Sequence, residues 1–435
     1  MTDLGFTLPL SENALLTALA RGQGRALMHV RHTGRLLSTA SMLDHLLVSQ
    51  SYDQQCEGHR ATWLFEIMQA VGWTERFVRP VCDAIHTTED TWDLAQLCAL
   101  ALLYARAGHP EAATALRWVV DTCPDKSAPW QAQSEILEFD GVEGFVRIAR
   151  HYLAAGLESG PYDWRDLDWL HTQAKQTLGE AEVLAALAEI PALKGLSGLI
   201  EAAEAERSKL RPAPHWEPAE VNVEALVTAA RQSTQPMIGW FMFWGNRATS
   251  AQLEQVVSTM ITTSELTVRW HLWQVFRHRA LPSAAPEILI DQVLACEDSW
   301  ARSRGISMLS RSSDPRMRVR AREALARSDL ELLPWLTHDR TPEDTQAICA
   351  ALRQAPTDDP DFVHSVGLDL LAVFGADATG CAEAMIWLWS ATPCSVCRGQ
   401  ALEQLQAAGG APAWLVEEAA SDSNLDIREL VAITS

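Results

Sequence analysis

The sequence contains no uninterrupted apolar stretch near the roughly 20 residues that a membrane-spanning helix requires. Its first residues also lack the basic start and apolar run of a secretory signal, because Asp3 and Glu12 lie among them. Cysteine is sparse, with nine residues spread over 435, whereas disulfide-stapled secreted domains are short and rich in cysteine. We therefore expect a cytoplasmic protein with reduced thiols and no membrane segment.

Recognisable catalytic motifs are missing as well. The sequence has no GxxxxGKS or GxxxxGKT phosphate loop, no HExxH pair, no GxSxG elbow and no dinucleotide-binding glycine fingerprint. The single CxxC, Cys394-Ser-Val-Cys397, has no second CxxC or close histidine pair to complete a zinc site, so two thiols packed at a helix start are favoured. We predict no catalytic residue, no metal and no cofactor. A protein that is not an enzyme is favoured, although an enzyme without these motifs stays open.

Apolar residues at helical spacing run along almost the whole chain. In Thr91–Gly108 they fall at three- and four-residue steps, which places them on one face of a helix. Phe139–Leu153 and Glu182–Ile190 follow the same period, and no series of alternating strands is evident. Glycine and proline lie mainly between such segments, as in Gly108-His-Pro110. The pattern predicts an all-α chain of short helices.

The helical segments are short, number roughly two dozen, and are joined by still shorter linkers, a rhythm typical of stacked helical hairpins. We expect an all-α fold in the form of a right-handed superhelical α-solenoid of stacked antiparallel hairpins. Three prolines lie in Lys209–Pro218, and each removes an N–H donor and clashes with the preceding helical turn. We therefore predict a Pro-rich joint at 211–218 between an N-terminal half, 1–210, and a C-terminal half, 219–435.

A recurrent Asp–Arg spacing marks the C-terminal half. The three pairs are Asp298 with Arg304, Asp314 with Arg320, and Asp422 with Arg428. Such an Asp can cap a helix, and the Arg can pair with the Asp of a neighbouring repeat in a ladder that fixes the stacking register. This half resembles HEAT repeats, most clearly over Ser264–Leu325, although Asp298 and Asp314 are only 16 residues apart. In the N-terminal half, Ala99–Leu116 resembles a tetratricopeptide hairpin.

The segment Arg302–Arg327 is basic, in contrast with the rest of the chain. It holds eight arginines and two carboxylates, whereas the net charge of the whole chain is −21. Arg316, Arg318 and Arg322 are candidates for binding an anionic partner, because guanidinium groups recognise carboxylates and phosphates. The alternative, which we favour slightly, is a solvated helix that compensates nearby acidic helices.

Two further features are candidates for contact with a partner. Trp300 is one of 17 tryptophans, and large aromatic side chains dominate both cores and binding hot spots. Core packing is the favoured role for most of them, so a tryptophan exposed on the concave face of the solenoid would mark the binding surface. The acidic run with Asp163, Asp166 and Asp168 alternates with aromatic rings, and we interpret it as a solvated or partner-facing surface rather than an acid–base site.

These observations favour a non-catalytic protein–protein interaction module with a basic partner, since complementary charge accelerates encounter. A bacterial adaptor, or an immunity protein that masks a toxin, would fit this composition. The resemblance to HEAT repeats also implies an alternative, a nucleic-acid-binding protein or a DNA-glycosylase-type enzyme using Arg302–Arg327, with Trp300 and Asp298 nearby. Nucleic acid is disfavoured because binding to phosphate depends on lysine and arginine, and this chain is strongly acidic.

Overall fold

The structure is a computed structural model that describes residues 6–36, 38–53, 56–122, 131–155, 164–209, 222–233, 238–283, 285–312, 314–338, 340–375 and 377–432. Within these ranges the chain forms helices joined by turns and loops, and no strand is present. The predicted all-α class is confirmed, whereas the superhelical form stays a prediction. The predicted joint at 211–218 lies outside the described residues. None of the helices described is both long and apolar enough to cross a bilayer.

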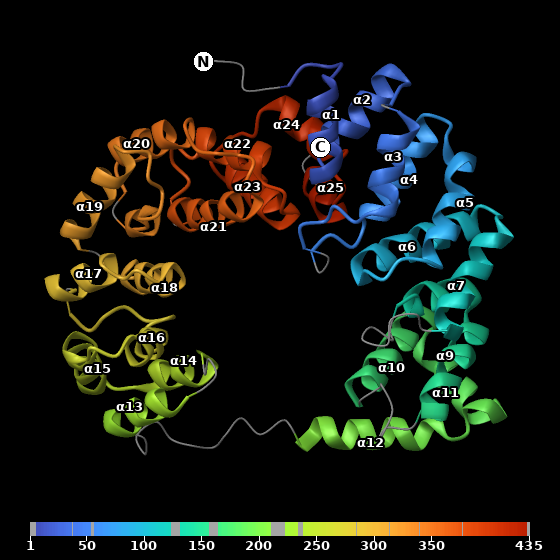
Figure 1. The fold of residues 1–435 in the computed structure, drawn as a ribbon, viewed down its shortest axis with the longest axis horizontal. Coiled ribbons are helices and arrows are strands. Elements are labelled where there is room, and N and C mark those ends of the chain that lie inside the picture. The colour runs from blue at the N-terminus through green and yellow to red at the C-terminus, as the bar shows by residue number, and fades with distance from the viewer. Residues whose placement is uncertain are drawn as a thin grey trace. The chain divides into compact units, whose positions relative to one another are not determined.

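The helices preceding residue 210 are coloured blue to green in Figure 1. Their bounds are α1 (Glu12–Arg21), α2 (Gly24–Thr33), α3 (Thr39–Leu47), α4 (Arg60–Ala70), α5 (Thr74–Ile85), α6 (Thr91–Arg106), α7 (Pro110–Thr122), α8 (Gln133–Asp140), α9 (Val142–Ala155), α10 (Trp164–Leu178), α11 (Glu180–Glu189), the 3-10 helix η1 (Pro191–Leu193) and α12 (Leu196–Lys209).

The helices that follow residue 222 are coloured green-yellow to red. Their bounds are α13 (Val223–Gln232), α14 (Ile238–Arg247), α15 (Ser250–Thr262), α16 (Leu266–Gln274), α17 (Glu287–Leu294), α18 (Ser299–Leu309), α19 (Pro315–Leu325), the 3-10 helix η3 (Leu333–Leu336), α20 (Pro342–Leu352), α21 (Pro360–Gly375), α22 (Ala382–Ala391), α23 (Ser395–Ala407), α24 (Ala413–Ala419) and α25 (Leu425–Ala432).

Local sequence signals set many of these helix ends. The Ser11 hydroxyl accepts from the backbone N–H of Ala14 and so caps α1. Gly22 ends the same helix at φ 66°, a left-handed conformation that glycine adopts without steric cost. Before α15, Thr249 and Gln252 form a reciprocal capping box. The helices are therefore encoded locally, and their packing depends on the apolar faces between these ends.

The chain divides into two compact units. Unit 1 comprises residues 1–213, 393–395 and 413–435, and unit 2 comprises residues 214–392 and 396–412. The boundary after Ala213 falls within the Pro-rich segment in which the sequence predicts a joint. The predicted C-terminal half differs at its end, because Ala413–Ser435 clusters with unit 1 rather than with unit 2.

Unit 1 is built around α6, which packs against α4, α5, α7 and α8. The apolar face predicted for this helix is buried, and it comprises Leu94, Leu97, Cys98, Ala101, Leu102 and Ala105. Beyond α8 the packing continues through α9 and α10 to α12. From α4 to α12, the helices thus pack against neighbours that lie near them in the sequence.

The helices α24 and α25 complete unit 1 beside the first helices of the chain, as Figure 1 shows for α2 and α24. The Arg25 guanidinium donates two hydrogen bonds, of 2.6 and 2.9 Å, to the fully buried carboxylate of Glu418. The indole N–H of buried Trp63 donates to the carbonyl of Ser421 at 2.9 Å. A Cβ built on Gly24 would lie 1.9 Å from the Glu418 carbonyl oxygen, so glycine is required for this close approach.

Within unit 2, alternate helices from α13 to α18 pack in two rows (Figure 1). In one row α14 contacts α16, α16 contacts α18, and α18 contacts η3, which in turn packs on α21. In the other row α13 contacts α15, and α15 contacts α17. The second row continues through α19, which packs against α20 and η3 and is also joined to α17 and α20 by the ion pairs described below.

Candidate binding sites

Two arginines of α19 bind carboxylates on its α17 side. The Arg316 guanidinium lies 2.7 Å from Asp314 Oδ2 and 2.8 Å from Glu287 Oε2. Arg320 Nη2 lies 2.6 Å from Glu287 Oε1 and 2.9 Å from Asp291 Oδ1. The hydrogen bonds with Asp314 and Glu287 raise the pKa of Arg316 and Arg320 respectively, so both remain charged. These pairs attach α19 to α17.

The other two arginines of α19 share one carboxylate on α20. Arg318 lies 2.7 Å from Asp344 Oδ2, and Arg322 donates to Asp344 Oδ1. Burial alone would raise the pKa of Asp344, but hydrogen bonds from Arg322, Arg318 and Thr341 outweigh it and lower this pKa to about 2. The predicted binding residues Arg316, Arg318 and Arg322 therefore serve ion pairs between helices, and their use by an anionic partner stays a prediction.

The aspartates of the predicted ladder stand at helix starts or turns. Asp298 accepts from the backbone N–H of Ala301 at 2.7 Å and caps α18. Asp314 accepts from the backbone N–H of Arg316 at 2.9 Å and caps α19. In the turn before α25, Asp422 accepts from the backbone N–H of Asn424 at 3.0 Å.

The arginines of the predicted ladder differ from the expected pairing. Arg320 binds Glu287 and Asp291, because these α17 carboxylates face its side of α19. Arg304 lies over the ring of Trp300, with 5.4 Å from its guanidinium carbon to the ring centroid.

A different contact recurs at this six-residue spacing: an arginine reaches back to the backbone carbonyl six positions earlier. Arg428 donates to the Asp422 carbonyl at 2.5 Å, and Arg428 also binds Glu66 within unit 1. Two other arginines make the same contact, Arg269 with Thr263 at 3.1 Å and Arg302 with Cys296 at 3.4 Å. The recurrent arginine thus ties a helix to the loop that precedes it.

Trp300 is the centre of an exposed aromatic surface on unit 2. Its side chain is 48% exposed, and its ring lies 4.7 Å from that of buried Trp270, with 31° between the ring planes. Arg304 covers one side of the ring, and its pKa is lowered by burial and by the neighbouring charge of Arg277. We call Trp270, Trp300 and Arg304 the Trp300 surface. Tryptophan and arginine are the residue types enriched at binding hot spots.

The acidic run on α10 is less open than the sequence suggests. Asp163 lies outside the described residues, whereas Asp166 and Asp168 are half-buried. The carbonyl oxygen of Asp166 accepts a hydrogen bond from the Tyr152 hydroxyl at 3.2 Å, and neither aspartate is free of interactions. This run therefore belongs to the packing of α10 as well as to the surface.

The two cysteines of the CxxC are buried, at 4% exposure for Cys394 and 1% for Cys397. Cys397 lies in the first turn of α23, and its Sγ is 3.5 Å from His364 Nδ1 on α21. Each thiol therefore packs inside the protein.

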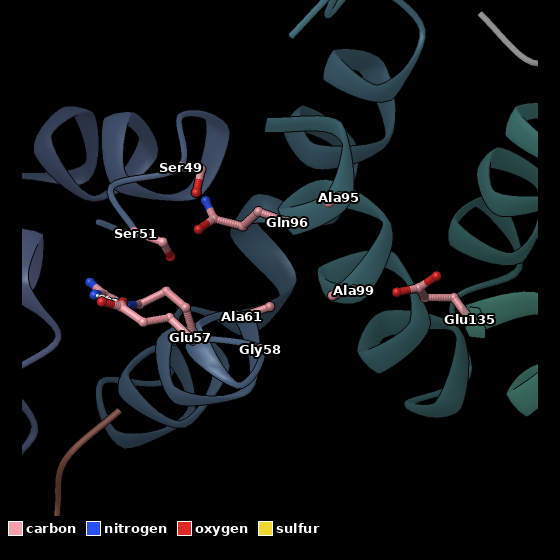
Figure 2. A pocket seen from close by; sticks show the side chains of 10 residues that line it. Ser49, Ser51, Glu57, Gly58, Ala61, Ala95, Gln96, Ala99 and Glu135 are labelled. Atoms are coloured by element: carbon pink, nitrogen blue, oxygen red, sulfur yellow. Dashed lines mark hydrogen bonds and ion pairs between the residues drawn. The ribbon is translucent and has the colours of Figure 1, made fainter. Parts of the chain in front are cut away.

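Unit 1 contains a cavity of about 280 Å³ (Figure 2). It is lined by Ser49, Ser51, Glu57, Gly58, Arg60, Ala61, Ala95, Gln96, Ala99 and Glu135. Glu57 and Arg60 form a buried ion pair, and the Gln96 amide donates to the carbonyls of His45 and Leu46 at 3.0 Å. One oxygen of Glu57 and the amide oxygen of Gln96 have no hydrogen-bond donor among the described residues. Burial raises the pKa of Glu135 to about 7.

Unit 2 contains a larger cavity of about 440 Å³, between α18, the turn after α19, and α21. Its lining residues are Ser303, Ile306, Ser307, Ser328, Asp329, Leu330, Glu331, Pro334, Pro356, Phe362, Ser365, Val366 and Asp369. The volume falls in the range of about 300–1,000 Å³ that is typical of ligand pockets. We call this space the unit 2 cavity.

Three carboxylates line the unit 2 cavity, and they differ in their partners. Glu331 lies 2.6 Å from the guanidinium of Arg302, and Asp329 accepts from the backbone N–H of Glu331 at 3.0 Å. Half-buried Asp369 has no hydrogen-bond or ion-pair partner in the described part of the chain. Burial raises the pKa of Asp369 to about 7, because no neighbour stabilises its charged form.

Sequence motifs alone do not find these cavity residues. One usable signal exists, since Asp369 is a lone carboxylate within the apolar run Val366-Gly-Leu-Asp-Leu-Leu-Ala-Val. A charge in such a run is either paired or functional, and pairing can be checked only in the folded chain. Comparison of the chain with protein-family models, with curated proteins and with solved structures finds no match.

Proposed function

We propose that this chain is a non-catalytic binding protein, a HEAT-like solenoid of stacked helical hairpins whose partner is another protein with a basic patch. The observation that carries the proposal is the pairing of all four arginines of α19 with carboxylates of α17, α20 or their own helix cap. These four are half of the eight arginines in the basic segment Arg302–Arg327, and their charges are thereby neutralised within unit 2.

This pairing bears on the choice between a protein and a nucleic acid as partner. A phosphate would have to compete for guanidinium groups that already hold carboxylates at 2.6–2.9 Å. The chain has 56 acidic and 35 basic residues. Even if every arginine and lysine were paired with a carboxylate of the same chain, many carboxylates would remain to face the solvent. Such an excess attracts basic proteins and repels nucleic acid.

The Trp300 surface supplies the apolar component that a specific interface needs. An exposed tryptophan stacked on a buried one is rigid, so little side-chain entropy is lost when a partner covers it. An adaptor, or an immunity protein that masks a basic toxin, would use such a surface, with the net charge of −21 on the whole chain accelerating encounter.

The test begins with proteins cross-linked to the purified chain in a lysate, each of which is then produced and titrated individually. We expect a basic protein to bind, and Trp300→Ala to weaken it at least tenfold without changing the melting temperature. Trp92→Ala is the matched control, because Trp92 is similarly exposed at 41% but lies in unit 1.

A 30-base-pair DNA duplex, titrated at two salt concentrations, tests the alternative. Salt-sensitive binding to the duplex that is lost in Arg316→Ala and Arg318→Ala, or recovery of acidic proteins alone, would overturn the proposal.

A further inference from the structure

The unit 2 cavity combines apolar walls with a charged group. Ile306, Leu330, Pro334, Phe362 and Val366 supply the apolar surface. The carboxylate of Asp369 and the hydroxyls of three serines on α18 and α21 supply hydrogen-bond acceptors. The lining is thus mixed, with apolar side chains beside polar groups that can orient one ligand group.

We propose that this cavity receives one arginine side chain of the protein partner, with the guanidinium at Asp369 and the aliphatic stem along the apolar walls. The inference rests on the proposed function, since it names the group on a basic partner that this unit recognises. It is specific to one cavity, however, and can fail while the partner proposal stands.

The partners of the neighbouring charges single out Asp369. The charge of Glu331 is balanced by Arg302 at 2.6 Å, and Asp329 is engaged with the backbone of the same turn. Among the described residues, Asp369 is the one carboxylate of the three with neither a cation nor a hydrogen-bond donor, although it is half-buried in the cavity lining. Burying an unpaired carboxylate costs free energy, and a cation that enters the cavity removes that cost.

The acceptors favour guanidinium over ammonium. An arginine head carries five N–H donors in a plane, whereas a lysine head carries three donors at one point. The carboxylate of Asp369 can accept two of the five, and the hydroxyls of Ser303, Ser307 and Ser365 can accept others. The three methylene groups of the arginine stem match the apolar walls.

The experiment uses the full chain and three small probes: Nα-acetyl-arginine amide, the isosteric but uncharged Nα-acetyl-citrulline amide, and Nα-acetyl-lysine amide. Saturation-transfer NMR detects binding through the side-chain methylene protons of each probe. We expect saturation of the arginine probe, none of the citrulline probe, and at least threefold weaker binding of the lysine probe. Equal binding of arginine and citrulline, or no binding of arginine at 10 mM, overturns the proposal.

Two variants locate the binding. Asp369→Asn removes the charge at nearly constant volume, and Ser307→Phe fills the cavity from an exposed position without changing charge. Both should lower the affinity for the arginine probe at least tenfold. Glu254→Gln removes an exposed carboxylate of α15 outside the cavity and should leave the affinity unchanged. Retained affinity in both cavity variants, with melting temperatures no lower than that of the unmodified chain, would refute the assignment.

The outcome separates the two proposals. Arginine binding that depends on Asp369 supports the cavity site even if no basic protein is found. If a basic protein binds through the Trp300 surface but ignores both cavity variants, the cavity proposal alone fails.

Discussion

Replacing Asp369 with asparagine should stabilise unit 2 at neutral and alkaline pH. Burial raises the pKa of this carboxyl from 3.8 to about 7. Between these values the folded chain keeps a proton that the unfolded chain has released, so the native protein loses stability as pH rises from about 4 to about 7. Asparagine has no charge to bury, and the variant should not share this loss.

The magnitude follows from the same two pKa values. Each pKa unit is worth about 1.4 kcal/mol, which sets an upper limit of about 4 kcal/mol. Asp369 is only half-buried and the cavity of about 440 Å³ can admit water, so part of the charge is screened. We therefore expect a stabilisation of about 1–3 kcal/mol at pH 8, shrinking towards zero at pH 4.5.

Hydrogen exchange of the α21 amides at both pH values is the suitable measurement, because two units need not unfold together. Asp358→Asn is the control, since Asp358 is exposed and its loss should change stability by less than about 0.5 kcal/mol. Destabilisation by Asp369→Asn at pH 8, or a stabilisation of equal size at pH 4.5, would refute the reasoning.

Three other substitutions test the contacts described above. Asp344→Ala should destabilise unit 2 by about 2–4 kcal/mol in urea unfolding at pH 7, because it removes a buried acceptor of two arginines and a helix cap. Since the pKa of Asp344 is lowered to about 2, the stability difference between the variant and the unmodified chain should fall as pH drops from about 4 to 2. A stability difference that stays constant over this range would contradict the reasoning. Gly24→Ala should destabilise unit 1 by about 1–3 kcal/mol, because the added Cβ clashes with Glu418. Gly58→Ala is the control and should be nearly neutral, since a Cβ there would have nothing within 4 Å. Equal melting temperatures of the two variants would show that α24 can shift away from Gly24 without a loss of stability. Trp300→Ala should leave the melting temperature unchanged while it weakens partner binding at least tenfold, and a loss of stability instead would assign Trp300 to the core.

Much of the helical structure could be predicted because its signals are local. The period in Thr91–Gly108 anticipates α6 at Thr91–Arg106 to within two residues at its end. The short interval between Asp298 and Asp314 also has a simple explanation, since these residues cap the consecutive helices α18 and α19. Caps and apolar periodicity act over a few residues, so a sequence displays them directly.

The long-range contacts could not be predicted in the same way. The sequence marks Arg316 and Arg318 as notable, but it does not identify Glu287 and Asp344 as their partners. Those pairs depend on which helices become neighbours. The cavities are harder still, because their linings combine residues from elements far apart in the chain. The lone carboxylate Asp369 is the exception, since its apolar surroundings are visible along a single helix.

The close packing of α24 on α2 has a consequence for how the protein is made. Glu418 follows Arg25 by 393 residues, so a ribosome adding about 5–20 residues per second needs about 20–80 s to deliver it. Throughout this interval the surface at Gly24 lacks the packing of Glu418, and the indole N–H of Trp63 lacks its acceptor Ser421, although the helices that carry them are already synthesised. Nascent chains of this protein should consequently bind chaperones that protect exposed apolar surface, until the arrival of α24 releases them.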